Sequence, residues 1–165
     1  MTEVRPATAD DVPSITAIYN HWITETHVSF DAEPQTIEER TAWFSQYAES
    51  GRYRVFVAEQ NGQLVGVTYS SKFRPKASYE TTVETTVVVD PAAVGLGIGR
   101  VLLSHLVEAL QTEDVHRAVA LIALPNQPSV TLHEQLGYRT VGIHDEVGRK
   151  FGRYWSVQIM ERAFS

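Results

Sequence analysis

The fold of this chain is decided by one stretch of sequence, VVVDPAAVGLGIGRVLLSHLVEAL, which runs from Val87 to Leu110. Its β-branched start predicts a buried strand, and Asp90-Pro91 ends that strand. Apolar residues then recur at helical spacing from Leu102 to Leu110. Three alternate glycines lie between, where strand becomes helix; they are Gly95, Gly97 and Gly99.

This glycine-rich turn has the properties of an anion site. Glycine adopts positive φ without strain, which we expect at these positions, and lets backbone approach a ligand closely. The free N–H groups and the positive dipole end of the following helix attract negative charge. Arg100, in the first helical turn, opposes that dipole unless an anionic partner is present. A tight turn with a helix cap is the alternative interpretation, because short glycine patterns are weak evidence alone.

Two other nucleotide-binding motifs do not fit these glycines. A Walker loop ends in Gly-Lys-Ser/Thr, whereas Gly99 is followed by Arg100-Val101. A dinucleotide fold needs Gly-x-Gly-x-x-Gly near its first strand. The spacing here is Gly-x-Gly-x-Gly, and it lies past the midpoint of the chain.

The composition is that of a small globular domain without cysteine chemistry. A length of 165 residues with 43% hydrophobic content predicts one domain, 1–165. The chain has no apolar run of transmembrane length, and Met1-Thr2-Glu3 begins no signal peptide. The absence of cysteine excludes disulfides, thiolate metal sites and a cysteine nucleophile, and it fits a reducing cytoplasm. A net charge of −6 argues against a nucleic-acid surface, so a site for an anionic coenzyme must be locally basic.

The pattern along the chain predicts an α/β architecture with a mixed sheet. Thr8 and Asp11 have the spacing of a capping box for a helix through about Asn20. Asn61-Gly62 joins two alternating runs into a hairpin. The remaining expected elements are a short strand at Val4, strands over 53–59, 64–71, 79–89, 118–123, 140–144 and 154–160, and helices over 37–48, after the glycines, and over 129–136.

The glycine turn resembles the acyl-CoA binding motif of the GNAT N-acetyltransferase superfamily. That motif reads Gln/Arg-x-x-Gly-x-Gly/Ala, and the matching segment here is Val94-Gly95-Leu96-Gly97-Ile98-Gly99. Val94 lacks the polar side chain usual at the first position. Because the motif holds pyrophosphate mainly through backbone N–H groups, we expect this departure to tune coenzyme affinity. The resemblance implies the GNAT fold, a mixed central β-sheet flanked by about four α-helices.

Four further blocks narrow the resemblance to the phosphinothricin and methionine sulfoximine acetyltransferase group. They are YNHWITETHVSFDAEPQT (Tyr19 to Thr36), KFRPKASYETTVETTVVVD (Lys72 to Asp90), LPNQPSVTLHEQLGY (Leu124 to Tyr138) and GRKFGRYWSV (Gly148 to Val157). They occur in the same order as in that group and are spread along the chain from Tyr19 to Val157. The group implies acetyl-CoA as cosubstrate, no metal, a cytoplasmic homodimer, and neither a nucleic acid nor a membrane as partner.

Glu84 is the first candidate catalytic residue. Glutamate is a poor strand former, yet Glu84 lies inside Val83-Glu84-Thr85-Thr86-Val87. An exposed strand face is the ordinary explanation. The resemblance places this carboxylate beside the acyl thioester as general base, and partial burial would raise its pKa toward working pH.

His133 is the second candidate catalytic residue. A helical histidine is more often a surface or capping residue. In LHEQLGY, however, His133 occupies the place where many GNAT enzymes have the tyrosine that protonates the CoA thiolate, and the phosphinothricin group has histidine there. With an ordinary pKa near 6.5, it would give or take a proton at neutral pH.

The resemblance also implies which residues bind acetyl-CoA. Asn126 is a natural cap for the helix that follows it, and the resemblance adds a hydrogen bond to the pantetheine arm. The full predicted set is Val87, Val88, Val89, Gly95, Leu96, Gly97, Ile98, Gly99, Arg100 and Asn126.

The substrate site is predicted from a basic loop before the Glu84 strand. The ordinary interpretation of this segment is a solvated loop that contains Arg74, Lys76 and Tyr79. In the resembling group, however, such residues bind the substrate's acidic groups. Phe30 would form an apolar wall. Lys150 and Arg153 would close the pocket, from this or a second subunit. Trp155-Ser156 departs from the aromatic-x-Asp pattern associated with the group, which leaves the substrate identity open.

The sequence therefore predicts an N-acetyltransferase acting by direct attack on the α-amino group of a small amino-acid-like substrate. One alternative is the same chemistry on a protein N-terminus, an aminoglycoside or a polyamine. A second is a non-catalytic acyl-CoA sensor, which would tolerate loss of Glu84 and His133. A third is a generic interaction domain, which needs no glycine turn.

Overall fold

The computed structural model describes residues 1–164, which form one mixed β-sheet with helices packed against it. Within these residues the chain forms seven strands and four α-helices, as the sequence predicts. In chain order they are β1 (Thr2–Pro6), α1 (Val12–Glu25), α2 (Ile37–Phe44), β2 (Val55–Gln60), β3 (Gln63–Lys72), β4 (Thr82–Val89), α3 (Ile98–Leu110), β5 (Arg117–Ala123), α4 (Gln127–Gln135), β6 (Arg139–Lys150) and β7 (Arg153–Ala163).

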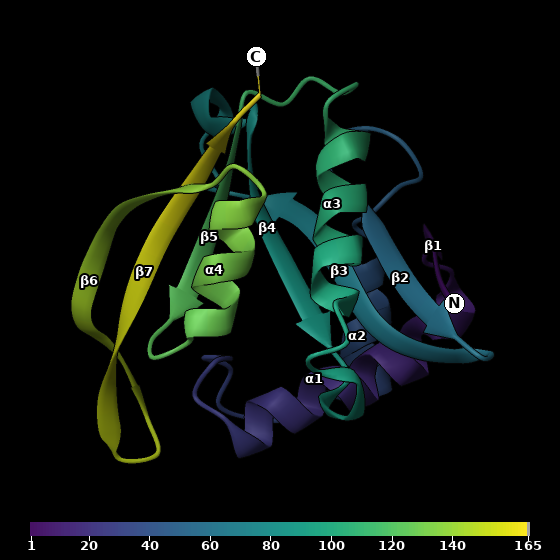
Figure 1. The fold of residues 1–165 in the computed structure, drawn as a ribbon, viewed down its shortest axis with the longest axis horizontal. Helices are drawn as coiled ribbons and strands as arrows, with labels where there is room; N and C mark the ends of the chain where they lie inside the picture. The colour runs from purple at the N-terminus through teal and green to yellow at the C-terminus, as the bar shows by residue number, and fades with distance from the viewer. Residues whose placement is uncertain (165) are drawn as a thin grey trace.

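The strands lie in the order β1-β2-β3-β4-β5-β7-β6. Neighbouring strands are antiparallel except β4 and β5, which are parallel. Helices cover both faces: α3 and α4 stand in front of the sheet in Figure 1, and α1 and α2 lie behind it. A core cluster that includes Leu103, Leu106 and Val130 fills the front layer, and another that includes Ile15, Ile23 and Val67 fills the rear layer.

The two parallel strands separate in the middle of the sheet. Their pairing runs only from Thr82 opposite Arg117 to Glu84 opposite Val119. Beyond Glu84 the strands diverge, and Figure 1 shows them spreading as a V. The edge of β4 that faces β5 therefore has no strand partner from Thr85 onward.

The predicted hairpin of β2 and β3 is confirmed. Gln60 pairs with Gln63, and the two residues between them, Asn61 and Gly62, have φ of 51° and 77°. Positive φ at both positions suits the twist of the flanking strands, which is why Asn-Gly is so reliable a signal.

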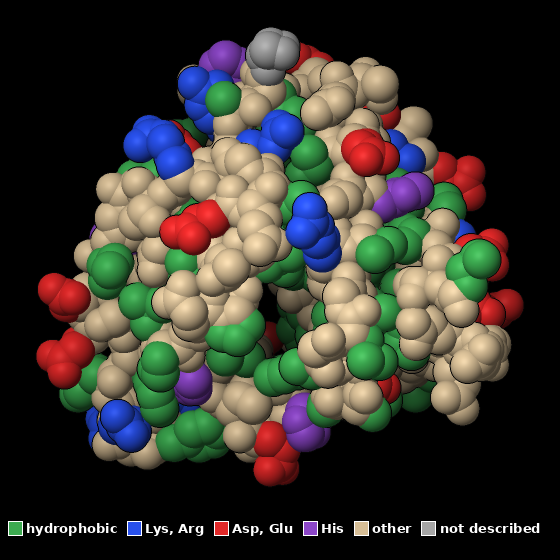
Figure 2. Space-filling view, in the orientation of Figure 1, with side chains coloured by type: hydrophobic (Ala, Val, Ile, Leu, Met, Phe, Trp, Pro, Cys, Tyr) green, Lys and Arg blue, Asp and Glu red, His purple; other side chains and the backbone are tan. Residues whose placement is uncertain are grey.

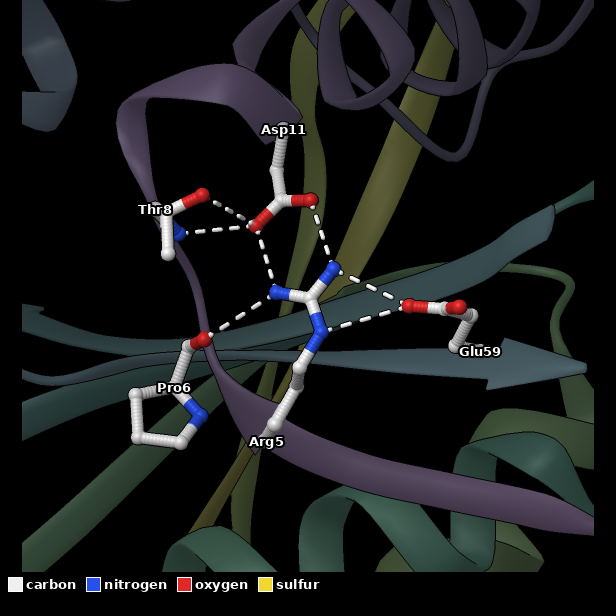
Figure 3. A network of polar contacts seen from close by, with 5 residues as sticks. All are labelled: Arg5, Pro6, Thr8, Asp11 and Glu59. Carbon is white, nitrogen blue, oxygen red and sulfur yellow. Dashed lines mark hydrogen bonds and ion pairs between the residues drawn. The ribbon is translucent and has the colours of Figure 1, made fainter. Parts of the chain in front are cut away.

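Figure 3 shows how the start of α1 is attached to the sheet. The predicted box between Thr8 and Asp11 forms, with the Thr8 N–H donating to the Asp11 carboxylate at 2.7 Å, and it begins a 3₁₀ turn (Ala9–Asp11) that leads into α1. Arg5 donates to both oxygens of this carboxylate at 2.8 Å and also contacts Glu59 of β2. Burial alone would raise the pKa of Asp11, but the hydrogen bonds from Arg5 and Thr8 outweigh it and lower the pKa.

Two helix ends differ from the prediction. The first helix continues past Asn20 to Glu25, because the segment contains no breaker and Ile23 is fully buried. It stops at Thr26, whose backbone is extended and whose hydroxyl donates to the Trp22 carbonyl. The second helix ends early, at Phe44, and the chain after it forms turns.

Two strand predictions also need correction. Tyr79 lies in a 3₁₀ turn (Ala77–Tyr79), and β4 begins only at Thr82. The closing strands are much longer than predicted, because β6 and β7 continue to a tight turn at Phe151-Gly152. Both turn residues have positive φ, 54° and 71°.

Candidate active site

A cavity of about 690 Å³ lies where β4 and β5 diverge. Figure 2 shows this face of the molecule hollowed between the regions that α3 and α4 occupy in Figure 1. Its walls come from the second half of β4, the end of β5, the glycine turn before α3, the helix α4 and the segment Val28–Phe30. Segments distant in sequence therefore meet around one space.

The glycine turn lies at one end of the cavity. Gly95 and Gly97 have φ of 85° and 79°, and Gly97 is the N-cap of α3. Gly99 differs from the expectation, because it does not have positive φ. A Cβ there would lie 3.3 Å from Leu132, so a close approach of α4 explains this glycine.

The N-terminus of α3 opens toward the same space. The first turn of a helix leaves backbone N–H groups without partners in the helix, and these suit an anion. Gly95, Gly97, Ile98, Gly99 and Arg100 line the cavity. Leu96, which was predicted with them, is exposed and does not line it.

Glu84 lies at the point where the two strands begin to diverge. It forms the last pair between β4 and β5, and its side chain lines the cavity. Burial raises the pKa of its carboxyl, and the positive charge of Arg74 offsets part of that effect. A half-buried carboxyl with a raised pKa has the properties of a general base.

His133 faces the cavity from α4 and is only 3% exposed. Its Nδ1 lies 2.7 Å from the Ser129 carbonyl oxygen, and its ring packs edge-on against Tyr138. Within residues 1–164, Nε2 is buried without a hydrogen-bond partner. Burial lowers the pKa of the imidazole, although the hydrogen bond to Ser129 opposes this.

Asn126 caps α4, as predicted. Its side-chain oxygen accepts from the Ser129 N–H at 3.4 Å. Asn126 also lines the cavity, together with Val87, Val88 and Val89 of β4. The cap leaves the amide nitrogen of Asn126 available for a ligand in the groove.

Three aromatic residues of the cavity wall were missed by sequence reasoning. The Tyr19 and Tyr69 hydroxyls lie 2.5 Å apart, and the buried guanidinium of Arg40 stacks 4.2 Å from the Tyr19 ring. Trp22 donates from Nε1 to the Val89 carbonyl oxygen at 2.8 Å and so holds the end of β4. The sequence signal was present, since buried Tyr and Trp need partners for their polar atoms.

The predicted substrate residues separate into two groups. Phe30 lines the cavity. Arg74 is exposed beside Phe73, yet close enough to act on the pKa of Glu84. Lys76 and Tyr79 are exposed in the same loop and do not line the cavity.

Lys150 and Arg153 also lie outside the cavity lining. The Lys150 ammonium donates to the carbonyl oxygens of Ile23 and Ser29 in its own chain, at 2.6 and 2.5 Å. Arg153 packs over the Trp155 ring, 4.4 Å from its centroid. In residues 1–164, no three His, Asp or Glu side chains gather as metal ligands, and no helix is long and apolar enough to span a membrane.

Comparison with known proteins defines the class. The family described as "Acetyltransferase (GNAT) domain" matches residues 4–158, so this chain belongs to the GNAT acetyltransferases, and the predicted family is confirmed. It is 48% identical to a phosphinothricin N-acetyltransferase of Streptomyces coelicolor, over 97% of this chain and 95% of that relative. An L-methionine sulfoximine/L-methionine sulfone acetyltransferase of Pseudomonas aeruginosa is 32% identical, over 96% and 92%.

Solved structures of acetyltransferases have the same fold as this chain. A phosphinothricin acetyltransferase from Sinorhizobium meliloti, in complex with AcCoA, superposes with a TM-score of 0.94 at 31% identity, over 99% of this chain and 89% of that one. The predicted GNAT fold is therefore confirmed, and acetyl-CoA is the cosubstrate that the family and the glycine turn both support.

Proposed function

We propose that this protein transfers the acetyl group of acetyl-CoA to the α-amino group of small amino acids of the phosphinothricin and methionine sulfoximine type. One observation carries the proposal: Glu84, His133 and the glycine turn line a single cavity at the divergence of β4 and β5. The names and full-length similarity of the relatives support the substrate class. Residues 1–165 act in this proposal as one acetyltransferase domain.

The acetyl-CoA site follows from the shape of the cavity. Pyrophosphate binds the free amides at the start of α3, where Gly95 and Gly97 admit close approach, and Arg100 adds a positive charge. The pantetheine arm occupies the space between the strands, beside Val87–Val89 and Asn126. The unpartnered edge of β4 supplies N–H groups for the thioester carbonyl and for the oxyanion that develops on it.

Glu84 and His133 have separate roles in proton transfer. Glu84 accepts a proton from the substrate ammonium, and the neutral amine attacks the carbonyl carbon of the thioester. The tetrahedral intermediate then breaks its C–S bond and expels the CoA thiolate. His133, neutral with an unprotonated Nε2, accepts the second amine proton and delivers it to the thiolate. Glu84 releases the first proton to solvent, so one turnover yields the amide, CoA thiol and one proton.

The acidic groups of the substrate bind on the Arg74 side of the cavity. Arg74 acts on Glu84 electrostatically, so an anion bound near Arg74 lies close to the base. Lys76 and Tyr79 belong to the same exposed loop and complete this surface when substrate binds. Phe30 packs against the apolar part of the substrate.

The decisive test is an amine panel. Purified protein with acetyl-CoA should release CoA thiol with phosphinothricin and methionine sulfoximine. It should release little with spermidine, an aminoglycoside or a peptide N-terminus. Turnover of those cationic or peptidic amines alone would contradict the proposed substrate class.

A homodimer built on the β6–β7 hairpin is part of the proposal. The hairpin of the edge strand β6, β7 and the turn between them carries exposed apolar side chains, each at least half accessible; they are Val141, Ile143, Val147, Phe151 and Tyr154. Exposed apolar area of this kind marks interfaces. Light scattering should show a dimer that Ile143→Glu converts to a monomer. We place the enzyme in the cytoplasm, in keeping with a chain that has no cysteine.

A further inference from the structure

The wall segment Val28–Phe30 is held in place by the β6–β7 hairpin. The segment follows α1 and has no helix or strand of its own. It lines the same cavity as the glycine turn, and Phe30 belongs to the wall against which the amine is proposed to bind. A segment without regular hydrogen bonding needs other contacts to keep one conformation.

Lys150 supplies the first contact. Its ammonium is buried and donates to the Ser29 carbonyl oxygen and to the Ile23 carbonyl oxygen in the last turn of α1. That helical turn has carbonyl groups without helical partners and a negative dipole end, so a cation is favourable there. Lys150 therefore binds the wall segment to the end of α1.

Gly148 supplies the second contact. A Cβ placed on this residue would lie 2.2 to 2.8 Å from three atoms of the Phe30 ring, so the ring rests directly on the strand backbone. Gly148 does not have positive φ, so its backbone conformation does not require glycine. Glycine is needed there because a side chain would collide with the Phe30 ring. Lys150 lies two residues further along β6 and therefore on the same face.

A third contact reinforces the other two. His27 stacks on Trp155 of β7 at 4.2 Å between centroids, and its Nε2 donates to the Pro125 carbonyl oxygen. Trp155 in turn donates from Nε1 to the Lys150 carbonyl oxygen at 2.9 Å. The tip of the hairpin and the wall segment thus form one packed unit.

We propose that Gly148 and Lys150 are positioning residues for the amine: they fix Phe30 and Ser29 at the cavity wall, and thereby set amine affinity, without touching the substrate. The inference rests on the proposed function, because it takes the amine to bind at this wall. It gives Lys150 a role different from the direct substrate contact that sequence resemblance implies.

The first experiment uses Gly148→Ala with Gly142→Ala as matched control. Both lie on β6, but a Cβ at Gly142 meets nothing within 4 Å. We expect Gly148→Ala to raise the amine KM about tenfold, within the range that small misplacements of binding groups produce. The acetyl-CoA KM and the Tm of Gly148→Ala should stay at wild-type values. Gly142→Ala should match the wild type in all of these measurements.

A double-mutant cycle separates positioning from general damage. Phe30→Ala removes the ring that Gly148→Ala displaces, so in that background Gly148→Ala should change the amine KM less than twofold. Additive effects of the two substitutions, or a wild-type amine KM in Gly148→Ala, would overturn the proposal.

Lys150→Met tests the first contact, that of the Lys150 ammonium with Ser29 and Ile23, without relying on activity. It should speed hydrogen exchange of the backbone amides in 26–31 and raise the amine KM, with Lys150→Arg closer to wild type. Unchanged exchange relative to Gly142→Ala would contradict the inference. A wild-type protein that acetylates neither phosphinothricin nor methionine sulfoximine would refute the proposed function instead, and the exchange comparison would still decide whether Lys150 holds the wall.

Discussion

Nδ1 of His133 lies 2.7 Å from the carbonyl oxygen of Ser129, one turn earlier in α4. A carbonyl oxygen only accepts hydrogen bonds, so Nδ1 carries the hydrogen. The neutral ring then presents a lone pair at Nε2, which is buried beside the cavity. Since burial also lowers its pKa, His133 enters the reaction as a neutral base and becomes an acid only after it has taken a proton.

His133→Phe should therefore change the pH dependence of catalysis. The pKa of His133 lies below 6.5, so the wild-type ring is neutral at pH 7 and becomes protonated as the pH falls. In the wild type, protonation of His133 and of Glu84 should both lower kcat as the pH falls. In the variant only the protonation of Glu84 remains, and kcat should be lower by roughly 10²-fold. Acetyl-CoA affinity should be retained, because Phe keeps the packing against Tyr138. An unchanged pH profile between pH 5 and 9 would make His133 a packing residue only.

Glu84→Gln should separate catalysis from binding. Removing the base should lower kcat on the order of 10²-fold or more, with little change in acetyl-CoA affinity by calorimetry. Equal turnover of variant and wild type at neutral pH is the result that excludes Glu84 as base.

The same substitution should stabilise the fold at neutral pH. Because the folded pKa of Glu84 is raised above 4.5, ionisation costs stability as the pH rises from the unfolded pKa through the folded one. Gln removes that cost, so the Tm of the variant should exceed that of the wild type at pH 7. The difference should vanish below pH 4, where the carboxyl is protonated in both states. A lower Tm at pH 7 would contradict this assignment.

Arg74→Ala should weaken amine binding and also shift the base. Loss of a charge-assisted hydrogen bond, worth about 1.5–3 kcal/mol, should raise the amine KM by roughly tenfold to a hundredfold. Arg74 lowers the pKa of Glu84, so its removal should move the Glu84 limb of the kcat profile to higher pH. The acetyl-CoA KM should hardly change. A profile identical to that of the wild type would show that Arg74 does not act on the base.

Gly97→Val should weaken acetyl-CoA binding. Gly97 has φ of 79°, which a β-branched residue adopts only under strain, and it is the N-cap of the helix that receives the pyrophosphate. Gly142→Ala, which meets no neighbouring atom, serves as the control. Isothermal titration with a folded variant decides the matter, since unaltered affinity would place the coenzyme elsewhere.

Local sequence signals predicted the features that depend on local chemistry. Asn61-Gly62 needs only its own φ values to form a hairpin, and the glycines before α3 mark a strand-to-helix turn by themselves. Phe151-Gly152 adopts the same left-handed conformations, but phenylalanine is atypical there, so the long hairpin was missed. The partners of Lys150 lie 127 and 121 residues away in sequence, and no local pattern reports contacts of that range.

The divergence of β4 and β5 at Glu84 has a consequence for protein engineering. The proposed base is anchored by the last pair of a continuous sheet, whereas the surfaces proposed to select the amine lie on the Arg74 loop, on the wall segment Val28–Phe30 and on the strand beneath it. Apart from Arg74, which lowers the pKa of Glu84, the residues proposed to select the acceptor lie on stretches of chain separate from the base. Libraries that vary these stretches but keep Arg74 should yield enzymes for new amino acids while the acetyl-transfer step, and the scaffold that performs it, is inherited intact.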